Sequence, residues 1–89
     1  MRVSNEFILR EIAGEYMLVP VGSAAAAFNG LITMNEVGNF IFSALHTDRT
    51  EEELVKEIIS EYDVPAETAL ADLREFLDQL RQVNALVED

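Results

Sequence analysis

Residues 30–45 constrain the fold most, because their apolar spacing changes from that of a strand to that of a helix. Residues 31–34, Leu-Ile-Thr-Met, form a short run compatible with an extended strand. Beyond Asn35 the apolar side chains recur with the spacing of one helical face, at Val37, Phe40, Ile41, Ala44 and Leu45. Asn35 is placed to cap this helix through its side-chain oxygen. The chain therefore passes from strand to helix across one residue, and the other elements must be arranged around that junction.

The composition describes one small folded domain with an acidic surface. The chain has 89 residues, 49% of them hydrophobic, no cysteine and a formal net charge of −11. Without cysteine there is no disulfide, thiolate nucleophile or Cys-ligated metal. Residues 1–45 carry four acids and two bases, whereas residues 46–89 carry thirteen acids and four bases. Such a surface repels a phosphate backbone, which excludes non-specific nucleic-acid binding. The acidity serves solubility or attracts a basic partner.

Nothing in the sequence indicates a membrane or an export signal. The apolar run after the N-terminus is broken at Arg10 and Glu11, unlike a signal peptide. No apolar run approaches the roughly 18 residues that a membrane-spanning helix requires. We therefore expect a cytoplasmic protein with no membrane partner.

The first third of the chain predicts a β-hairpin followed by a loop. Strands over residues 7–13 and 16–21 are separated by Gly14-Glu15, which suits a type II′ turn. That turn pairs Ile12 with Met17, Arg10 with Val19 and Ile8 with Val21. The opposite face then carries Phe7, Leu9, Glu11, Tyr16 and Leu18. Pro20 cannot donate to a ladder and is expected at the end of its strand or beside a bulge. Residues 22–30 are predicted to be a loop, whose alanines make too short a helical turn to persist alone.

The rest of the chain predicts a third strand over residues 31–34 and helices over residues 36–45, 51–62 and 65–83. Thr50 and Glu53 form a capping box, and Pro65 suits the first position of the last helix. Asn84 suits a left-handed end, and Leu86-Val87 is a candidate for one more strand contact. Residues 1–89 are thus predicted to be a single α+β domain, a winged-helix-like fold with an N-terminal three-stranded antiparallel sheet followed by three helices.

One border of the last helix combines apolar and basic residues. Leu70, Arg74, Leu77 and Arg81 follow one another at intervals of four, three and four residues. Either Arg74 pairs with Asp78 and the arginine stems lie over the core, or the border is the basic rim of a groove for an acidic peptide.

The sequence offers no catalytic constellation. His46 is the only histidine, so neither a His-based metal site nor a Ser/His/Asp triad can be assembled. The glycines form no phosphate-binding motif, and the carboxylates fall on helix starts and solvent faces. We expect a protein that is not an enzyme and uses no cofactor or metal.

The ordered set of motifs resembles the PqqD family of precursor-peptide recognition elements, and the match covers nearly the whole chain. The segments that carry it are Leu18-Val19-Pro20, Met34-Asn35-Glu36-Val37-Gly38, Phe40-Ile41-Phe42-Ser43-Ala44-Leu45, Thr50-Glu51-Glu52-Glu53-Leu54, Tyr62-Asp63-Val64-Pro65 and Asp72-Leu73-Arg74-Glu75-Phe76-Leu77. The sequence departs from the family at Asn84, where a glycine is common, and in the alanine loop.

The resemblance implies a peptide chaperone without catalytic activity. Such proteins bind the leader segment of a ribosomally synthesised precursor peptide and present it to a modifying enzyme, often a radical SAM protein, in natural product biosynthesis. In that family the leader adds as a strand to the third strand and lies against the last helix. We therefore place the site on Leu31, Ile32, Thr33 and Met34, facing Leu70, Arg74, Leu77 and Arg81. The family geometry leaves open which border of the helix faces the strand, and the basic border is chosen on charge grounds. The leucines of the helix would take apolar leader residues and the arginines acidic ones.

Other functions remain open at this stage. A winged-helix interaction or dimerisation module would use the same strand edge to pair with another protein or a second copy, and a monomer or weak dimer is expected. A nucleic-acid binder would need a basic helix, which is absent. An acyl carrier would need a serine in an Asp-Ser-Leu context, which no serine here has.

Overall fold

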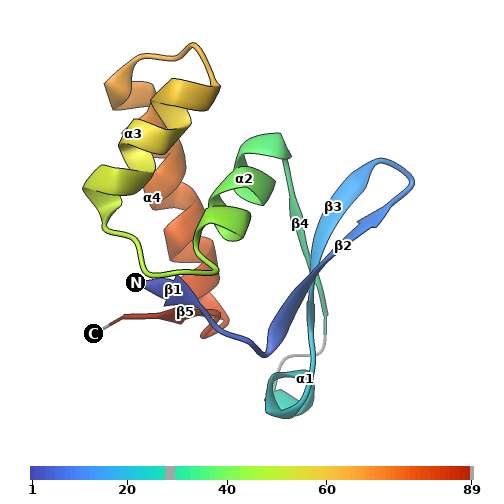
Figure 1. The fold of residues 1–89 in the computed structure, drawn as a ribbon. Helices are drawn as coiled ribbons and strands as arrows, with labels where there is room; N and C mark the ends of the chain where they lie inside the picture. The colour runs from blue at the N-terminus through green and yellow to red at the C-terminus, as the bar shows by residue number, and fades with distance from the viewer. Residues whose placement is uncertain (28–29, 89) are drawn as a thin grey trace.

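The elements of the fold follow the predicted order. A computed structural model describes residues 1–27 and 30–88. Its elements are β1 (Arg2–Val3), β2 (Phe7–Ile12), β3 (Glu15–Pro20), α1 (Ser23–Ala27), β4 (Ile32–Met34), α2 (Glu36–Ala44), α3 (Glu51–Glu61), α4 (Ala66–Gln82) and β5 (Leu86–Val87). The strands β2, β3 and β4 form an antiparallel sheet in that order. The β2–β3 hairpin projects away from the packed α2, α3 and α4 (Figure 1). The predicted α+β fold, a three-stranded antiparallel sheet followed by helices, is confirmed.

The hairpin turn lies one residue earlier than predicted. Ala13 and Gly14, with φ of 53° and 81°, occupy the turn, and Ile12 pairs with Glu15. Two successive positive φ angles define a type I′ turn, which matches the strand twist. The predicted Gly14-Glu15 turn is therefore wrong, and each residue of β2 pairs two positions earlier on β3 than predicted, for example Arg10 with Met17 instead of Val19. Because side chains alternate with a period of two, this shift leaves the two predicted faces intact.

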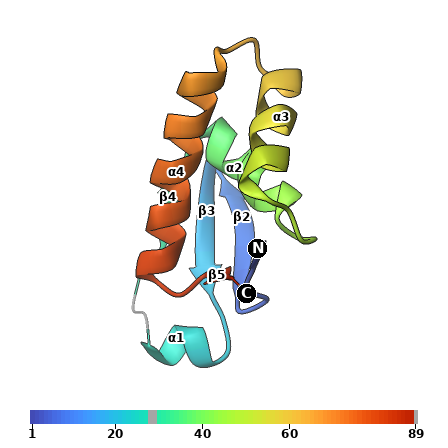
Figure 2. The same cartoon turned by 90° about the vertical axis from the view of Figure 1, so that its left-hand side faces the viewer.

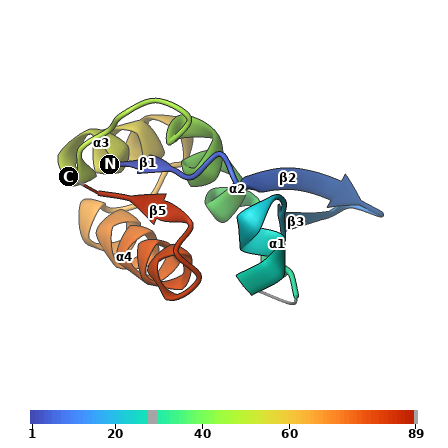
Figure 3. The same ribbon diagram turned by 90° about the horizontal axis from the view of Figure 1, so that it is seen from below.

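The N-terminal residues belong to the fold, which the sequence analysis did not anticipate. Arg2 pairs with Val87 and Val3 with Leu86, so β1 and β5 lie side by side below the helices (Figure 3). The Val3 N–H also donates to the Leu45 carbonyl at 2.9 Å. The predicted strand contact of Leu86-Val87 is thus confirmed, and its partner is the start of the chain.

The predicted helix ends are confirmed to within a residue or two. The Gly38 N–H donates to Asn35 Oδ1 at 2.8 Å at the start of α2. At the start of α3 the Glu53 N–H donates to Thr50 Oγ1 at 3.1 Å, and the Thr50 N–H donates to Glu53 Oε1 at 2.9 Å. After α4, Asn84 adopts a φ of 58° and reverses the chain toward β5, as its sequence position predicts.

Two features differ in the first half of the chain. Residues 23–27, predicted as loop, form the helix α1, whose first N–H at Ser23 donates to Glu6 Oε1 at 3.2 Å. The loop predicted over residues 22–30 includes residues 28 and 29, which lie outside the described residues. Pro20 ends β3, as predicted.

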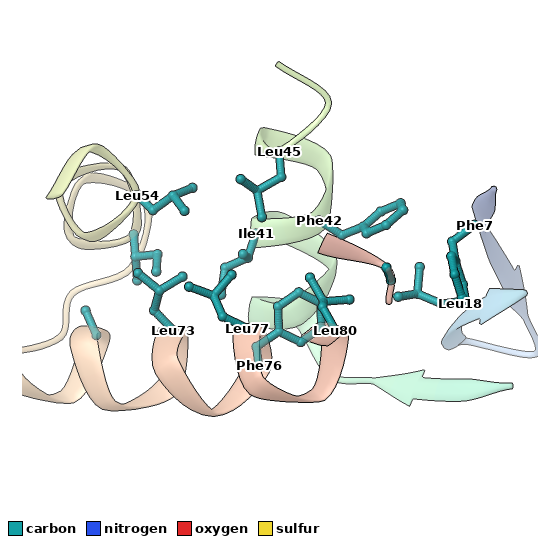
Figure 4. Close-up of a cluster of buried hydrophobic side chains, with 13 residues drawn as sticks. Phe7, Leu18, Ile41, Phe42, Leu45, Leu54, Leu73, Phe76, Leu77 and Leu80 are labelled. Carbon is teal, nitrogen blue, oxygen red and sulfur yellow. The ribbon is translucent and has the colours of Figure 1, made fainter. Parts of the chain in front are cut away.

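The core lies between the helices and one face of the sheet. α3 and α4 pack side by side (Figures 1 and 2). Figure 4 shows Leu73, Leu77 and Leu80 of α4 meeting side chains from α2 and α3, while the sheet contributes Phe7 and Leu18. The largest fully buried side chains are Phe42, Leu18, Ile41, Leu45, Leu54, Ile58, Leu73, Leu77 and Leu80. Among the described residues, no helix packs on the opposite face of the sheet (Figure 3).

We predict that Thr50→Ala lowers the free energy of unfolding by about 1 kcal/mol, because the Glu53 N–H loses its side-chain acceptor. Urea denaturation at neutral pH measures this loss. Thr47→Ala, a nearby substitution outside the capping box, is the control and is expected to cost less.

The capping box also predicts a pH dependence. The Thr50 N–H bond, followed by that of the Thr50 hydroxyl, lowers the pKa of Glu53 from its ordinary value of 4.5. A lowered carboxyl pKa adds stability above 4.5 that is lost as the pH falls through the folded-state value. The stability difference between the protein and Glu53→Gln should therefore be present at neutral pH and vanish in acid. A pH-independent difference would contradict this origin.

Candidate peptide-binding site

The strand β4 offers an open backbone edge centred on Thr33. Residues that flank a two-residue turn form a hydrogen-bonded pair, and hydrogen-bonded pairs alternate along an antiparallel ladder. Counting from the Ile12–Glu15 pair, Tyr16 and Leu18 direct their N–H and C=O groups toward β4. They pair there with Met34 and Ile32. Thr33, between these two, therefore turns its N–H and C=O away from the sheet, toward the side on which no strand of the described chain pairs.

A groove of about 170 Å³ borders this edge. Its lining comes from β4, the first turns of α2 and one face of α4: Thr33, Met34, Asn35, Val37, Gly38, Ile41, Asp72, Glu75, Phe76 and Gln79. The α4 members recur at intervals of three, one and three residues, so they share one face of that helix. The site thus combines an open strand edge with an adjoining hollow.

Gly38 lies where the first turn of α2 approaches both β4 and α4 beside the groove. A Cβ atom built on Gly38 would lie 3.2 Å from Met34 Cβ and 3.2 Å from Phe76 Cε1. Glycine therefore lets the first turn of α2 approach β4 and α4 closely. The side chains of Met34 and Phe76 meet beside it and form part of the groove floor.

Comparison with known proteins agrees with this architecture. The sequence profile of the family described as "PqqD: Coenzyme PQQ synthesis protein D" matches residues 12–86. The chain belongs to the PqqD family. Among solved structures it is similar to TbiB1 in complex with the TbiA(beta) leader peptide, with 28% sequence identity, a TM-score of 0.75 and 100% of each chain covered. None of the curated proteins matches the sequence.

In this PqqD-family protein, two of the four predicted strand residues, Thr33 and Met34, line the groove. Ile32, Thr33 and Met34 form β4, and Leu31, 51% exposed, immediately precedes it. Thr33 is exposed, whereas Ile32 and Met34 are half-buried and pack against the core. Their predicted role in peptide binding stays a prediction.

The predicted residues of the last helix are not among the described residues that line the groove beside β4. Leu77 is fully buried in the core, and Leu70 is half-buried. At about 100° per residue, Arg74 and Arg81 lie on the side of α4 opposite to Asp72, Glu75 and Gln79. Burial of Leu77 thus turns the basic border toward α3 and the C-terminus, and the role of these four residues in peptide binding stays a prediction.

Both arginines are instead paired with acids outside the groove. Arg74 Nη2 lies 3.1 Å from Glu51 Oε1 on α3. Arg81 contacts Asp78 Oδ1 at 2.9 Å and Glu88 Oε1 at 2.8 Å. Hydrogen bonds to these carboxylates raise the pKa of each arginine, and the bond from Arg81 lowers the pKa of Glu88. The alternative prediction, an Arg74–Asp78 pair, is wrong.

Sequence reasoning missed the residues of α4 that do line the groove. Phe76, 7% exposed, belongs to the core and also lines the groove. Asp72, Glu75 and Gln79 recur at intervals of three and four residues, which identifies a polar border. That signal was available, but choosing between the two borders requires knowing which side of α4 packs on α3.

Other parts of the described chain provide no competing chemistry. His46 Nδ1 lies 3.1 Å from the Phe42 carbonyl at the end of α2, where its ring also packs on Phe42. A hollow of about 290 Å³ lies between α1, the start of β2 and the end of α4, and has no lining from β4. Within residues 1–27 and 30–88, no three His, Cys, Asp or Glu side chains are placed to hold a metal ion. In the same ranges, none of the helices is long and apolar enough to cross a bilayer.

We predict that Leu77→Ala lowers the free energy of unfolding by about 2–5 kcal/mol, because it leaves a cavity among fully buried neighbours. Leu70→Ala is the matched control on the same border and should cost less, since Leu70 is half-buried. Chemical denaturation of the two variants measures the difference. Equal, small costs would show that Leu77 is not a core residue.

Proposed function

We propose that this protein binds the leader segment of a ribosomally synthesised precursor peptide by strand addition at β4 and presents the peptide to a modifying enzyme. The observation that carries the proposal is the open backbone of Thr33 beside the groove on α4. The proposed contact residues are Leu31, Ile32, Thr33 and Met34 on the strand side. Phe76 and its polar neighbours replace the leucines and arginines expected from sequence.

Strand addition suits the chemistry of this edge. The N–H and C=O of Thr33 can exchange two hydrogen bonds with one residue of an extended peptide, whatever its side chain. The groove then reads the side chains that point toward it. Its volume, about 170 Å³, is below the roughly 300–1,000 Å³ of small-molecule sites, so it suits one or two peptide side chains better than a metabolite.

The similarity to TbiB1 supports the proposal. That protein was solved in complex with a leader peptide, and its chain and this one match over their full lengths. The resemblance to peptide chaperones further supports a role that is not catalytic, exercised in the cytoplasm, with the chemistry supplied by a partner enzyme such as a radical SAM protein. This last assignment rests on the family resemblance.

An alternative is pairing of β4 with β4 of a second copy, because an open edge also accepts an identical strand. Sedimentation with and without leader peptides separates the two. A tight dimer that no leader peptide dissociates would favour the dimerisation module.

We predict that Thr33→Pro weakens leader binding at least about tenfold, because it removes the outward N–H donor. The fold should survive, since proline is tolerated where the N–H faces away from the sheet. Ile32→Pro is the matched control, because its N–H points toward β3 and its loss should destabilise the sheet itself.

Titration of the ¹⁵N-labelled protein with leader peptides encoded beside its gene measures affinity and site together. We expect shifts at residues 31–34 and at Phe76. Leader binding that leaves both regions unshifted, or that Thr33→Pro does not weaken, would contradict strand addition at β4.

A further inference from the structure

The groove combines an apolar floor with an acidic wall, and this combination specifies the peptide. We infer that the site selects peptides in which an apolar side chain is accompanied, two residues away, by lysine or arginine. The inference rests on the proposed function, since it names the class of peptide that β4 would bind. It reverses the charge expected from the sequence, where an acidic peptide was predicted.

The direction of the peptide side chains follows from the register of β4. A residue paired with Thr33 projects its side chain to the same face of the sheet as Thr33. Its two neighbours project to the other face, which Ile32 and Met34 share and which the helices cover. The side chains that reach the groove are therefore spaced by two residues, or about 7 Å.

The floor of the groove accepts one of these side chains. Met34, Val37 and Phe76 supply apolar surface, and Ile41 lies fully buried beneath them. Among the described residues that line the groove, the charged ones, Asp72 and Glu75, both belong to α4. An aliphatic or aromatic residue is the complement of such a floor.

The wall on α4 accepts the other side chain only if it is basic. Asp72 and Glu75 are exposed and about 4.5 Å apart along the helix axis. Within the described ranges neither carboxylate has an ion-pair partner, whereas Glu51, Asp78 and Glu88 are held by arginines. The two carboxylates are therefore available to a cation from outside.

The distribution of the bases excludes the opposite choice. Within residues 1–27 and 30–88 no lysine or arginine lines the groove, and Arg74 and Arg81 form ion pairs on the other side of α4. An acidic peptide side chain would meet Asp72 or Glu75 without a compensating charge, on a protein of net charge −11. A basic peptide would be attracted at long range as well as at the groove.

The test is a selection of short random peptides displayed against the whole protein. Peptides that are enriched are then mapped by protection of the Thr33 amide from hydrogen exchange. We expect those that protect Thr33 to carry an excess of lysine or arginine two residues from an apolar side chain. Their binding should weaken as salt is raised, because the attraction is screened.

A charge variant and a matched control identify the carboxylates responsible. Asp72→Asn with Glu75→Gln should weaken binding of the selected peptides by up to about fivefold for each carboxylate that pairs with the peptide cation, since that is the most that an exposed ion pair contributes to affinity. Asp63→Asn with Glu67→Gln changes the net charge equally and lies off the groove, so it should weaken them much less.

The outcomes separate this inference from the proposed function. Selected peptides that protect Thr33 but carry no excess of basic residues, or that lose equal affinity in both double variants, would overturn the inference alone. A selection that yields no peptide protecting Thr33 would overturn the proposed function and the inference together.

Discussion

The close approach at Gly38 is the constraint on which the arrangement of this domain depends. Three elements meet there, because the first turn of α2 contacts both β4 and α4 through a position with no side chain. Asn35 caps α2 and is the only residue between the end of β4 at Met34 and the start of α2 at Glu36. A Cβ atom at Gly38 would require Met34 or Phe76 to shift by a few tenths of an ångström, and both residues line the groove. The geometry of the site is therefore inherited from a packing requirement.

The core supports this arrangement from one side only. Leu18 and Phe7 anchor the sheet to the helices, while on the far face Ile12 is exposed and Ile8, Met17 and Val19 are half-buried. α4 contributes to the core with one face, pairs with α3 through Arg74 and Glu51, and still presents Asp72 and Glu75 at the groove. The sides of α4 therefore differ in composition. One side is apolar and faces the core, one pairs with α3, and one places carboxylates at the groove.

Sequence reasoning succeeded where structure is determined locally. The caps at Asn35 and Thr50, the left-handed Asn84 and the alternation of the hairpin all depend on residues a few positions apart. It failed where the deciding contact is distant or unusual. The pairing of Arg2 with Val87 joins the two ends of the chain, and a positive φ at Ala13 is rare for a residue with a side chain. The orientation of α4 could not be predicted for the same reason. Arg74 forms its ion pair with Glu51 on α3 rather than with Asp78, one turn away on α4.

The three-residue length of β4 limits how this edge can pair with another strand. Long open edges template the assembly of identical chains, but a strand that turns only the N–H and C=O of Thr33 outward provides too short a template for that. The same brevity means that backbone pairing alone cannot fix the register of an incoming strand, because any peptide residue can take the place opposite Thr33. Register must then come from the side chains that the groove admits. A short edge therefore offers little backbone for pairing between identical chains, and it makes the alignment of the proposed peptide depend on the peptide's sequence.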